Sequence, residues 1–200
     1  MMGTTHALAG AFLGAAIAVV APEFAAVVVV AAVAGSVAPD LDIYHGHRRT
    51  LHYPVYGWVV AAPAIALAVA VPSAWTVGAA TFLAAAALHG GMDVFGGGLE
   101  LRPWEAGSER AVYSHYHGAW LEPRRLVPYD GSPHDLGLAG AFAVMPATTL
   151  PEPVPAFVAA VLAVSVAYVA LRKRLAALWA TLARALPAPV APYVPERFYD

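Results

Sequence analysis

Six long apolar runs, separated by shorter polar stretches, dominate the pattern along this 200-residue chain. An α-helix needs roughly 17 to 25 apolar residues to cross a hydrocarbon core of about 30 Å. The pattern therefore predicts an all-α, polytopic membrane bundle of about six transmembrane or re-entrant helices. The six runs are approximately Thr5 to Ala21, Phe24 to Ala38, Val55 to Val71, Ala74 to Val94, Leu136 to Leu150 and Val154 to Leu171.

Composition supports a membrane location. The chain is 60% hydrophobic and 12% charged, whereas soluble domains are about 25% charged. It contains no cysteine, so disulfides and thiolate metal sites are excluded. A formal net charge of -2 gives no indication of a nucleic-acid partner. Membrane lipids are the surroundings that this composition predicts, and the sequence does not define an oligomeric state.

The positions of the basic residues predict the orientation. With six spans and an inner N-terminus, all of them fall on one side, and the three outer connections contain no Lys or Arg. This is the positive-inside pattern of a multi-pass protein in the cell (inner or plasma) membrane, with both termini in the cytoplasm. The basic residues are Arg48, Arg49, Arg102, Arg110, Arg124, Arg125, Arg172, Lys173, Arg174, Arg184 and Arg197.

Two regions follow from this pattern. Residues 1–171 form the expected membrane-embedded domain, with a cytoplasmic loop at 95–135. Residues 172–200 are expected to form a basic amphipathic helix and then a proline-rich tail that is extended or disordered. Near the N-terminus, Gly10 and Gly14 match the small-xxx-small pattern of helix contacts, which we interpret as close packing within the bundle.

Histidines and carboxylates gather at the inner ends of four predicted helices. Each ionised group near lipid costs about 2.5 kcal/mol or more unless it is paired, hydrated or bound to a cation. His89 and Asp93 are four residues apart, so they share one helical face. A shared metal site would offset the cost for several groups at once. The candidates are His6, Asp40, Asp42, His52, His89 and Asp93.

The ligand types narrow the choice of metal. Imidazole and carboxylate without thiolate are typical of zinc, manganese or iron, and six candidates exceed the four ligands of one zinc ion. We therefore expect one to three divalent ions, most simply zinc. Plainer interpretations remain open: His6 as an interfacial residue, Asp40 and Asp42 as a helix-ending turn, and Arg48 and Arg49 as topology-setting charges in a solvated loop.

Five motifs in residues 1–104 carry a family resemblance. In order they are "THALAG", "GSVAPDLD", "HRRTLH", "LHGGMD" and "GLELRPW". Together they are similar to the LexA-regulated, membrane-bound, metal-dependent hydrolase family, which is remotely related to zinc-dependent phospholipase C and P1 nuclease. The resemblance implies metal ligands at matching positions, with Asp42 or Asp40 as the aspartate that follows the early histidine. The implied ligands are His6, Asp42, His52, His89 and Asp93.

The chain departs from the soluble zinc enzymes in one respect. Those enzymes carry a further histidine and an HxxxE pair, and no HxxxE occurs here. By the resemblance, His115, His117 or Glu105 in the long loop would be the replacements. Ordinary anchoring of the two histidines at the membrane interface is the alternative.

The resulting hypothesis is a metal-dependent hydrolase. A coordinated water would attack a phosphoester of a lipid or lipid-linked substrate. Arg48 and Arg49 would hold anionic oxygens, because guanidinium groups suit phosphate. Besides its role as a ligand, Asp42 would belong to the catalytic group, and Asp40 would orient a histidine or act as a general base.

Two alternatives belong to other classes of protein. A metal-handling transporter would place ionisable groups near the bilayer midplane, but the centres of these runs are mostly Ala and Val. A non-catalytic membrane scaffold would need only the arginines and the aromatic residues, which leaves His89 and Asp93 unexplained.

Overall fold

The computed structural model describes residues 1–43, 45–187, 189–190, 193–194 and 198 of the chain, and these are mostly helical. The six α-helices in these residues lie close to the six predicted runs, so the all-α prediction is confirmed at this level. They are α1 (Gly3–Val20), α2 (Ala25–Val37), α3 (Tyr56–Ala70), α4 (Ala74–Val94), α5 (Pro133–Thr149) and α6 (Val154–Ala185). Three short 3-10 helices accompany them: Pro22–Phe24, Ala38–Asp42 and Pro103–Glu105.

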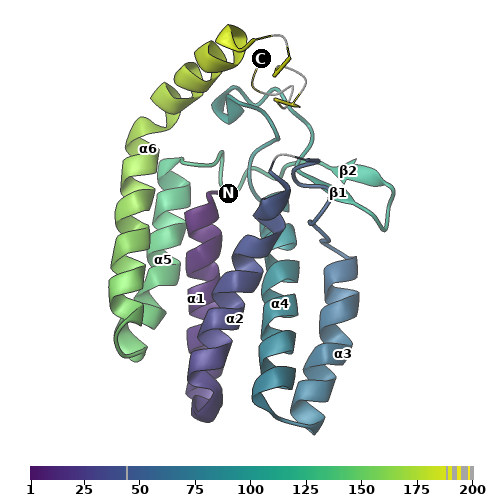
Figure 1. The fold of residues 1–200 in the computed structure, drawn as a ribbon, viewed down its shortest axis with the longest axis vertical. Coiled ribbons are helices and arrows are strands. Elements are labelled where there is room, and N and C mark those ends of the chain that lie inside the picture. The colour runs from purple at the N-terminus through teal and green to yellow at the C-terminus, as the bar shows by residue number, and fades with distance from the viewer. Residues whose placement is uncertain (44, 188, 191–192, 195–197, 199–200) are drawn as a thin grey trace.

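The helices stand side by side in a row. Their spatial order is α6, α5, α1, α2, α4, α3, and each contacts its neighbours in that order (Figure 1). The N-terminus and the long connections lie at one end of the row, whereas the short connections lie at the other (Figure 1). This arrangement brings the start of α1 and the ends of α2 and α4 together at the centre of one end.

Within the described residues, four helical segments are long and apolar enough to cross a membrane. They are Gly3–Val20, Pro22–Asp42, Ala74–Val94 and Val154–Ala185. Helix α3 is apolar but only 15 residues long. The structure thus agrees with a membrane protein, while the number of spans and their orientation stay predictions.

Glycines let the central helices approach closely. A Cβ atom added to Gly10 would lie 2.6 Å from the carbonyl oxygen of Ala32, and one added to Gly14 would lie 2.7 Å from Cα of Val29, both in α2. On the other side of α2, Gly35 lies against the backbone of Phe82 in α4. The interpretation that Gly10 and Gly14 pack within the bundle is therefore confirmed.

Two features were not predicted. A two-stranded antiparallel hairpin, β1 (Val112–Ser114) and β2 (Ala119–Leu121), pairs Tyr113 with Trp120 inside the long loop. Strands of three residues are too short to show a period-2 pattern. In addition, α6 passes the expected domain boundary at residue 171 without interruption. Its leucine-bearing basic segment is helical as predicted, while the proline-rich end lies largely outside the described residues.

We expect Gly35→Ala to lower the free energy of unfolding by about 1 to 3 kcal/mol, because the new methyl group overpacks the α2–α4 contact. Thermal unfolding of the detergent-solubilised protein measures this. Gly140→Ala in α5 is the matched control, because a Cβ there meets nothing within 4 Å. Equal destabilisation by both substitutions would contradict the close-contact account.

Candidate metal centre

Two carboxylates and two imidazoles converge where the central helices meet. Asp40, His52, His89 and Asp93 each offer one ligand atom, and these atoms all lie within 4.8 Å of one another. Asp40 lies in the 3-10 turn after α2, His52 precedes α3, and the last pair lies on the final turns of α4. The structure thus brings together three elements that are distant in sequence.

Five of the six distances between the ligand atoms are close to those of a tetrahedral shell. Nε2 of His89 lies 3.0 Å from Nε2 of His52 and 3.5 Å from both Oδ1 of Asp40 and Oδ2 of Asp93. Nε2 of His52 lies 3.8 Å and 3.5 Å from the same two oxygens. Ligands about 2.0 to 2.2 Å from a tetrahedral zinc ion are roughly 3.3 to 3.6 Å apart. The four atoms therefore surround a space of the right size for one ion.

The outer nitrogens of the two histidines fix their tautomers. Nδ1 of His89 donates to the backbone carbonyl of Ser36 at 2.6 Å, and Nδ1 of His52 donates to Oδ2 of Asp42 at 3.1 Å. Since both partners are acceptors, each neutral ring presents an Nε2 lone pair to the other ring. Two lone pairs at 3.0 Å, beside two carboxylates, are stabilised when a metal ion or a proton lies between them. Histidine ligands of metal ions are commonly oriented by partners of this kind.

Asp42 lies behind this group. Its buried carboxylate accepts hydrogen bonds from His52, from Nδ1 of His47 at 2.9 Å and from the Leu51 amide at 3.1 Å. The structure therefore places Asp40, and not Asp42, among the four potential ligands, and it gives Asp42 the orienting position that the sequence hypothesis gave to Asp40. Sequence reasoning also missed the Ser36 carbonyl, which carries no residue-specific signal.

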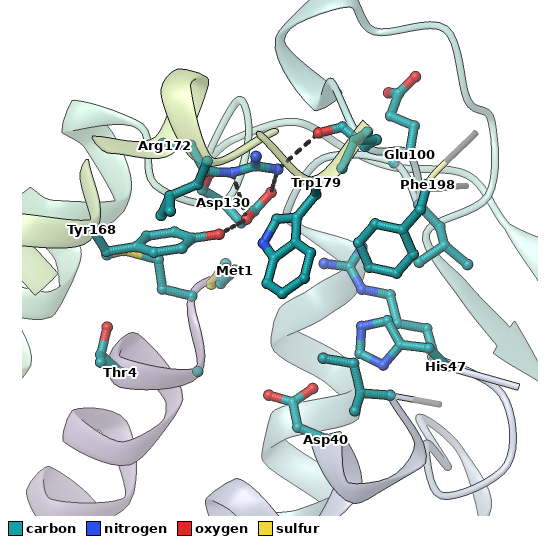
Figure 2. Close-up of a pocket in the computed structure, with 18 of the residues that line it drawn as sticks. Met1, Thr4, Asp40, His47, Glu100, Asp130, Tyr168, Arg172, Trp179 and Phe198 are labelled. Atoms are coloured by element: carbon teal, nitrogen blue, oxygen red, sulfur yellow. Dashed lines mark hydrogen bonds and ion pairs between the residues drawn. The ribbon is translucent and has the colours of Figure 1, made fainter. Parts of the chain in front are cut away.

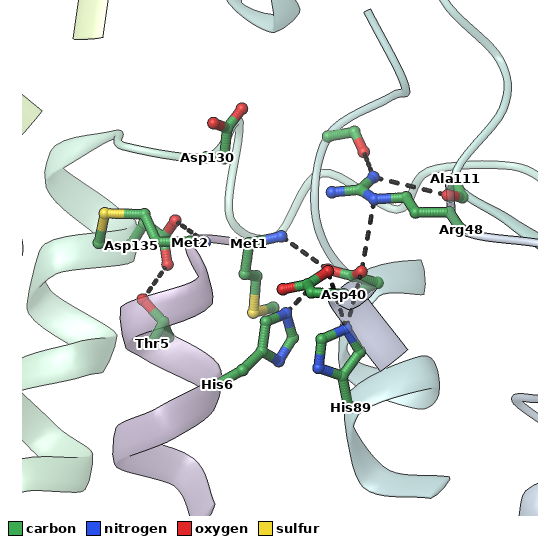
Figure 3. Close-up of polar contacts among 12 residues, drawn as sticks. Met1, Met2, Thr5, His6, Asp40, Arg48, His89, Ala111, Asp130 and Asp135 are labelled. Carbon is green, nitrogen blue, oxygen red and sulfur yellow. Dashed lines mark hydrogen bonds and ion pairs between the residues drawn. The ribbon is translucent and has the colours of Figure 1, made fainter. Parts of the chain in front are cut away.

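His6 supports the group from the side. Its ring stacks on that of His89 with centroids 3.7 Å apart (Figure 3). Nε2 of His6 lies 3.1 Å from Oδ1 of Asp93. The α-amino group of Met1 donates to the same oxygen at 2.7 Å. Asp93 thus uses one oxygen for these contacts and turns the other toward the ligand group. Among the described residues, Nδ1 of His6 is buried without a hydrogen-bond partner.

The two neighbouring arginines point in different directions. Arg48 is buried, and its Nη1 lies 3.5 Å from the Ala111 carbonyl (Figure 3). Its Nε lies 3.4 Å from Oδ2 of Asp93, and Nη1 also donates to the Gly97 carbonyl at 2.8 Å. Its φ of 60° is a left-handed conformation, which costs of order 1 to 3 kcal/mol in a non-glycine residue. Arg49 is exposed and lies over the ring of Tyr113 at 4.5 Å. Only Arg48 reaches the site.

The loop residues considered as replacement ligands lie elsewhere. His115 stacks on Tyr53 and bonds the Arg49 carbonyl, and His117 bonds the Ser114 hydroxyl. Glu105 forms an exposed ion pair with Arg102 at 3.7 Å. In the described part of the chain, none of the three enters the four-residue group.

The site is nearly closed. The side chains of His52, His89 and Asp93 are at most 2% exposed, whereas that of Asp40 is 26% exposed. Water or a substrate therefore reaches the group from the Asp40 side. Catalytic zinc sites keep a coordination position for water, so an ion held by all four side chains would take water as a fifth ligand from this side.

Comparison of the chain with family models, with curated proteins and with solved structures finds no match.

We expect His89→Ala to remove stoichiometric metal from the purified protein, because it deletes the ligand closest to the other three. Elemental analysis after gel filtration measures the metal content. His115→Ala, which removes a half-buried histidine outside the four-residue group, is the matched control and should retain the metal. Equal metal content in both variants would contradict the assignment.

We expect metal affinity to fall as the pH is lowered. Burial by itself lowers the pKa of His52, but its contacts with Asp42 and Asp93 outweigh burial and raise the pKa above the usual 6.5. A protonated ring cannot bind a metal ion, so a proton must leave before the metal binds. Competition with a chromophoric chelator across pH measures the trend, and pH-independent affinity would contradict it.

We expect Asp42→Asn to weaken metal binding by about 10- to 100-fold without abolishing it, because the amide orients His52 less firmly than the carboxylate does. Isothermal titration with zinc measures the change. A loss as complete as that in His89→Ala would instead place Asp42 among the ligands.

Proposed function

We propose that this protein is a membrane-bound, metal-dependent hydrolase that cleaves a phosphoester of a lipid or lipid-linked substrate. The observation that carries the proposal is the pair of imidazole Nε2 atoms, 3.0 Å apart and flanked by two carboxylates, with one accessible side. A cation at this point satisfies all four groups, and the opening leaves room for a reacting molecule.

Zinc is the metal that the ligand set favours. Two nitrogens and two oxygens at tetrahedral spacing suit Zn²⁺, while an all-oxygen shell would favour magnesium or calcium. Manganese and iron share these ligands and are distinguished by metal analysis. The four-residue group provides for one ion.

The chain's own residues supply binding and orientation. A bound divalent ion would lower the pKa of a coordinated water and so provide a nucleophile near neutral pH. Hydrolysis then forms a bond from the water oxygen to phosphorus, breaks the ester P–O bond and delivers a proton to the departing alcohol. Arg48, held beside the site by Gly97, is placed to bind an anionic oxygen of the substrate. Asp42 keeps His52 in its metal-binding tautomer.

The family resemblance agrees with this assignment. The motifs "GSVAPDLD", "HRRTLH" and "LHGGMD" contribute all four members of the group. The soluble enzymes bind a cluster of several zinc ions and carry an HxxxE pair. The absence of this pair here agrees with a centre that holds fewer metal ions.

The membrane orientation is part of the proposal. The connections at the end opposite the site contain no Lys or Arg, and the long loops at the site end carry Arg48, Arg102 and other basic residues. By the positive-inside rule the site faces the cytoplasm. Its position at the helix ends, away from the centres of the spans, favours an enzyme over a transporter.

The test is hydrolysis by the purified protein in detergent. We expect the zinc-loaded enzyme to cleave bis(p-nitrophenyl) phosphate and a phosphatidyl ester, and a chelator to abolish both activities. Asp40→Asn should lower kcat/KM by at least about 100-fold, because a carbonyl oxygen is a weaker ligand than a carboxylate. The control His115→Ala, outside the four-residue group, should retain activity. Metal-free activity, or an active His89→Ala variant, would overturn the proposal.

A further inference from the structure

An elongated cavity of about 570 Å³ adjoins the accessible side of the metal centre. Asp40, His47 and Arg48 line one part of it, and residues of α6 line another. Figure 2 shows Asp40 and His47 across the cavity from Tyr168, Arg172 and Trp179. The partly exposed carboxylate of the centre thus opens into a defined space. Its volume lies in the range of about 300 to 1,000 Å³ typical of small-molecule sites.

One face of α6 forms the far wall. Its lining residues are three or four positions apart, which places them on a single helical face. From the first to the last of them, the helix axis extends roughly 22 Å. The residues are Val164, Tyr168, Arg172, Leu175 and Trp179. The cavity therefore extends along the helix, from the membrane-spanning part toward the end of the bundle that carries the long loops.

The surroundings of α6 connect the cavity with lipid. Only 11% of its most apolar 18-residue window is buried inside the protein. Val164 lies in this apolar part and is 57% exposed, although it also lines the cavity. A hydrocarbon chain could therefore reach the cavity beside Val164 without passing through water.

Three polar side chains in the middle of the cavity, those of Asp130, Tyr168 and Arg172, bind one another. Arg172 donates from Nε to Oδ2 of Asp130 at 2.9 Å, and the Tyr168 hydroxyl donates to the same oxygen at 2.7 Å. Glu100 also lines the cavity; its Oε2 accepts a hydrogen bond from the Gly107 amide, while its Oε1 is a buried acceptor without a hydrogen-bond partner, so this carboxylate does not attract an anion. Recognition of an anion is thus left to Arg48 and the metal centre, at one end of the space.

We propose that this cavity binds a single-chain phosphorylated amphiphile. Its head lies against Arg48 and the metal centre, and its hydrocarbon chain lies along α6 against Val164 and Leu175. The position of the head rests on the proposed function, whereas the position of the chain rests on the cavity alone. The substrate class is accordingly a lipid phosphoester with one chain held by the protein, in preference to a soluble phosphoester.

The test uses the full chain in phosphatidylcholine nanodiscs and radiolabelled dodecylphosphonate, whose C–P bond resists hydrolysis. Val164→Trp and Leu175→Trp fill the apolar part of the cavity and should weaken binding at least tenfold. Val166→Trp is the matched control, since Val166 lies on the same helix, is 54% exposed and does not line the cavity. Equal binding by all three variants and the unmodified protein would overturn the inference.

A second measurement does not depend on how the variants fold. Dodecylphosphonate with a photoreactive diazirine at the chain end should crosslink to the α6 peptide around Val164 in the unmodified protein. Crosslinks spread evenly over all lipid-exposed helices would contradict the cavity site.

The same preparations separate the two proposals. In one outcome, all variants bind zinc and cleave bis(p-nitrophenyl) phosphate equally, and the tryptophan substitutions do not change dodecylphosphonate binding. This outcome would support the hydrolase and overturn the chain-binding site. In the other outcome, the Val164 and Leu175 variants lose dodecylphosphonate binding, but the unmodified protein binds no zinc. This outcome would support the chain-binding cavity and overturn the hydrolase.

Discussion

Two imidazole nitrogens facing each other at 3.0 Å in a nearly dry site are the constraint on which the rest of this structure depends. Nδ1 of each ring is hydrogen-bonded to an acceptor, the Ser36 carbonyl or the Asp42 carboxylate, so a neutral ring keeps its N–H outward and its Nε2 lone pair inward. Asp40 and Asp93 add two further acceptors. Such a set is costly without a cation, since unpaired polar groups in a low-dielectric interior lose their hydration.

The helix packing supplies the precision that this arrangement needs. Gly10 and Gly14 let α1 lie against α2, and Gly35 lets α2 lie against α4. As a result, the ends of α2 and α4 deliver Asp40, His89 and Asp93 to one place at one depth. Without water to drive helix association inside the bilayer, close backbone contact between small residues is the main source of this order.

The position of the centre also relates its chemistry to the membrane. It lies at the end of the bundle, where water can arrive, yet its accessible side opens into a cavity bounded by a largely lipid-exposed helix. This combination of a polar end and an apolar flank is what the proposed amphiphile site rests on.

The sequence by itself determined the helical class, the approximate bounds of the helices and the residue types of the candidate site. Apolar run length, and the cost of ionisable groups at helix ends, are local properties that can be read directly along the chain. It also indicated His52, His89 and Asp93 as candidate ligands. It could not decide whether Asp40 or Asp42 is the aspartate ligand, because the two are only two residues apart.

Only the tertiary structure decided which side chains face the common centre. The 3-10 turn at Ala38–Asp42 directs Asp40 toward His89 and places Asp42 behind His52. The left-handed backbone at Arg48 helps to direct that arginine inward, while its neighbour Arg49 points outward. The reason is physical: spacing along a chain fixes which residues share a regular helical face, but in irregular turns the side-chain directions depend on dihedral angles that distant contacts select.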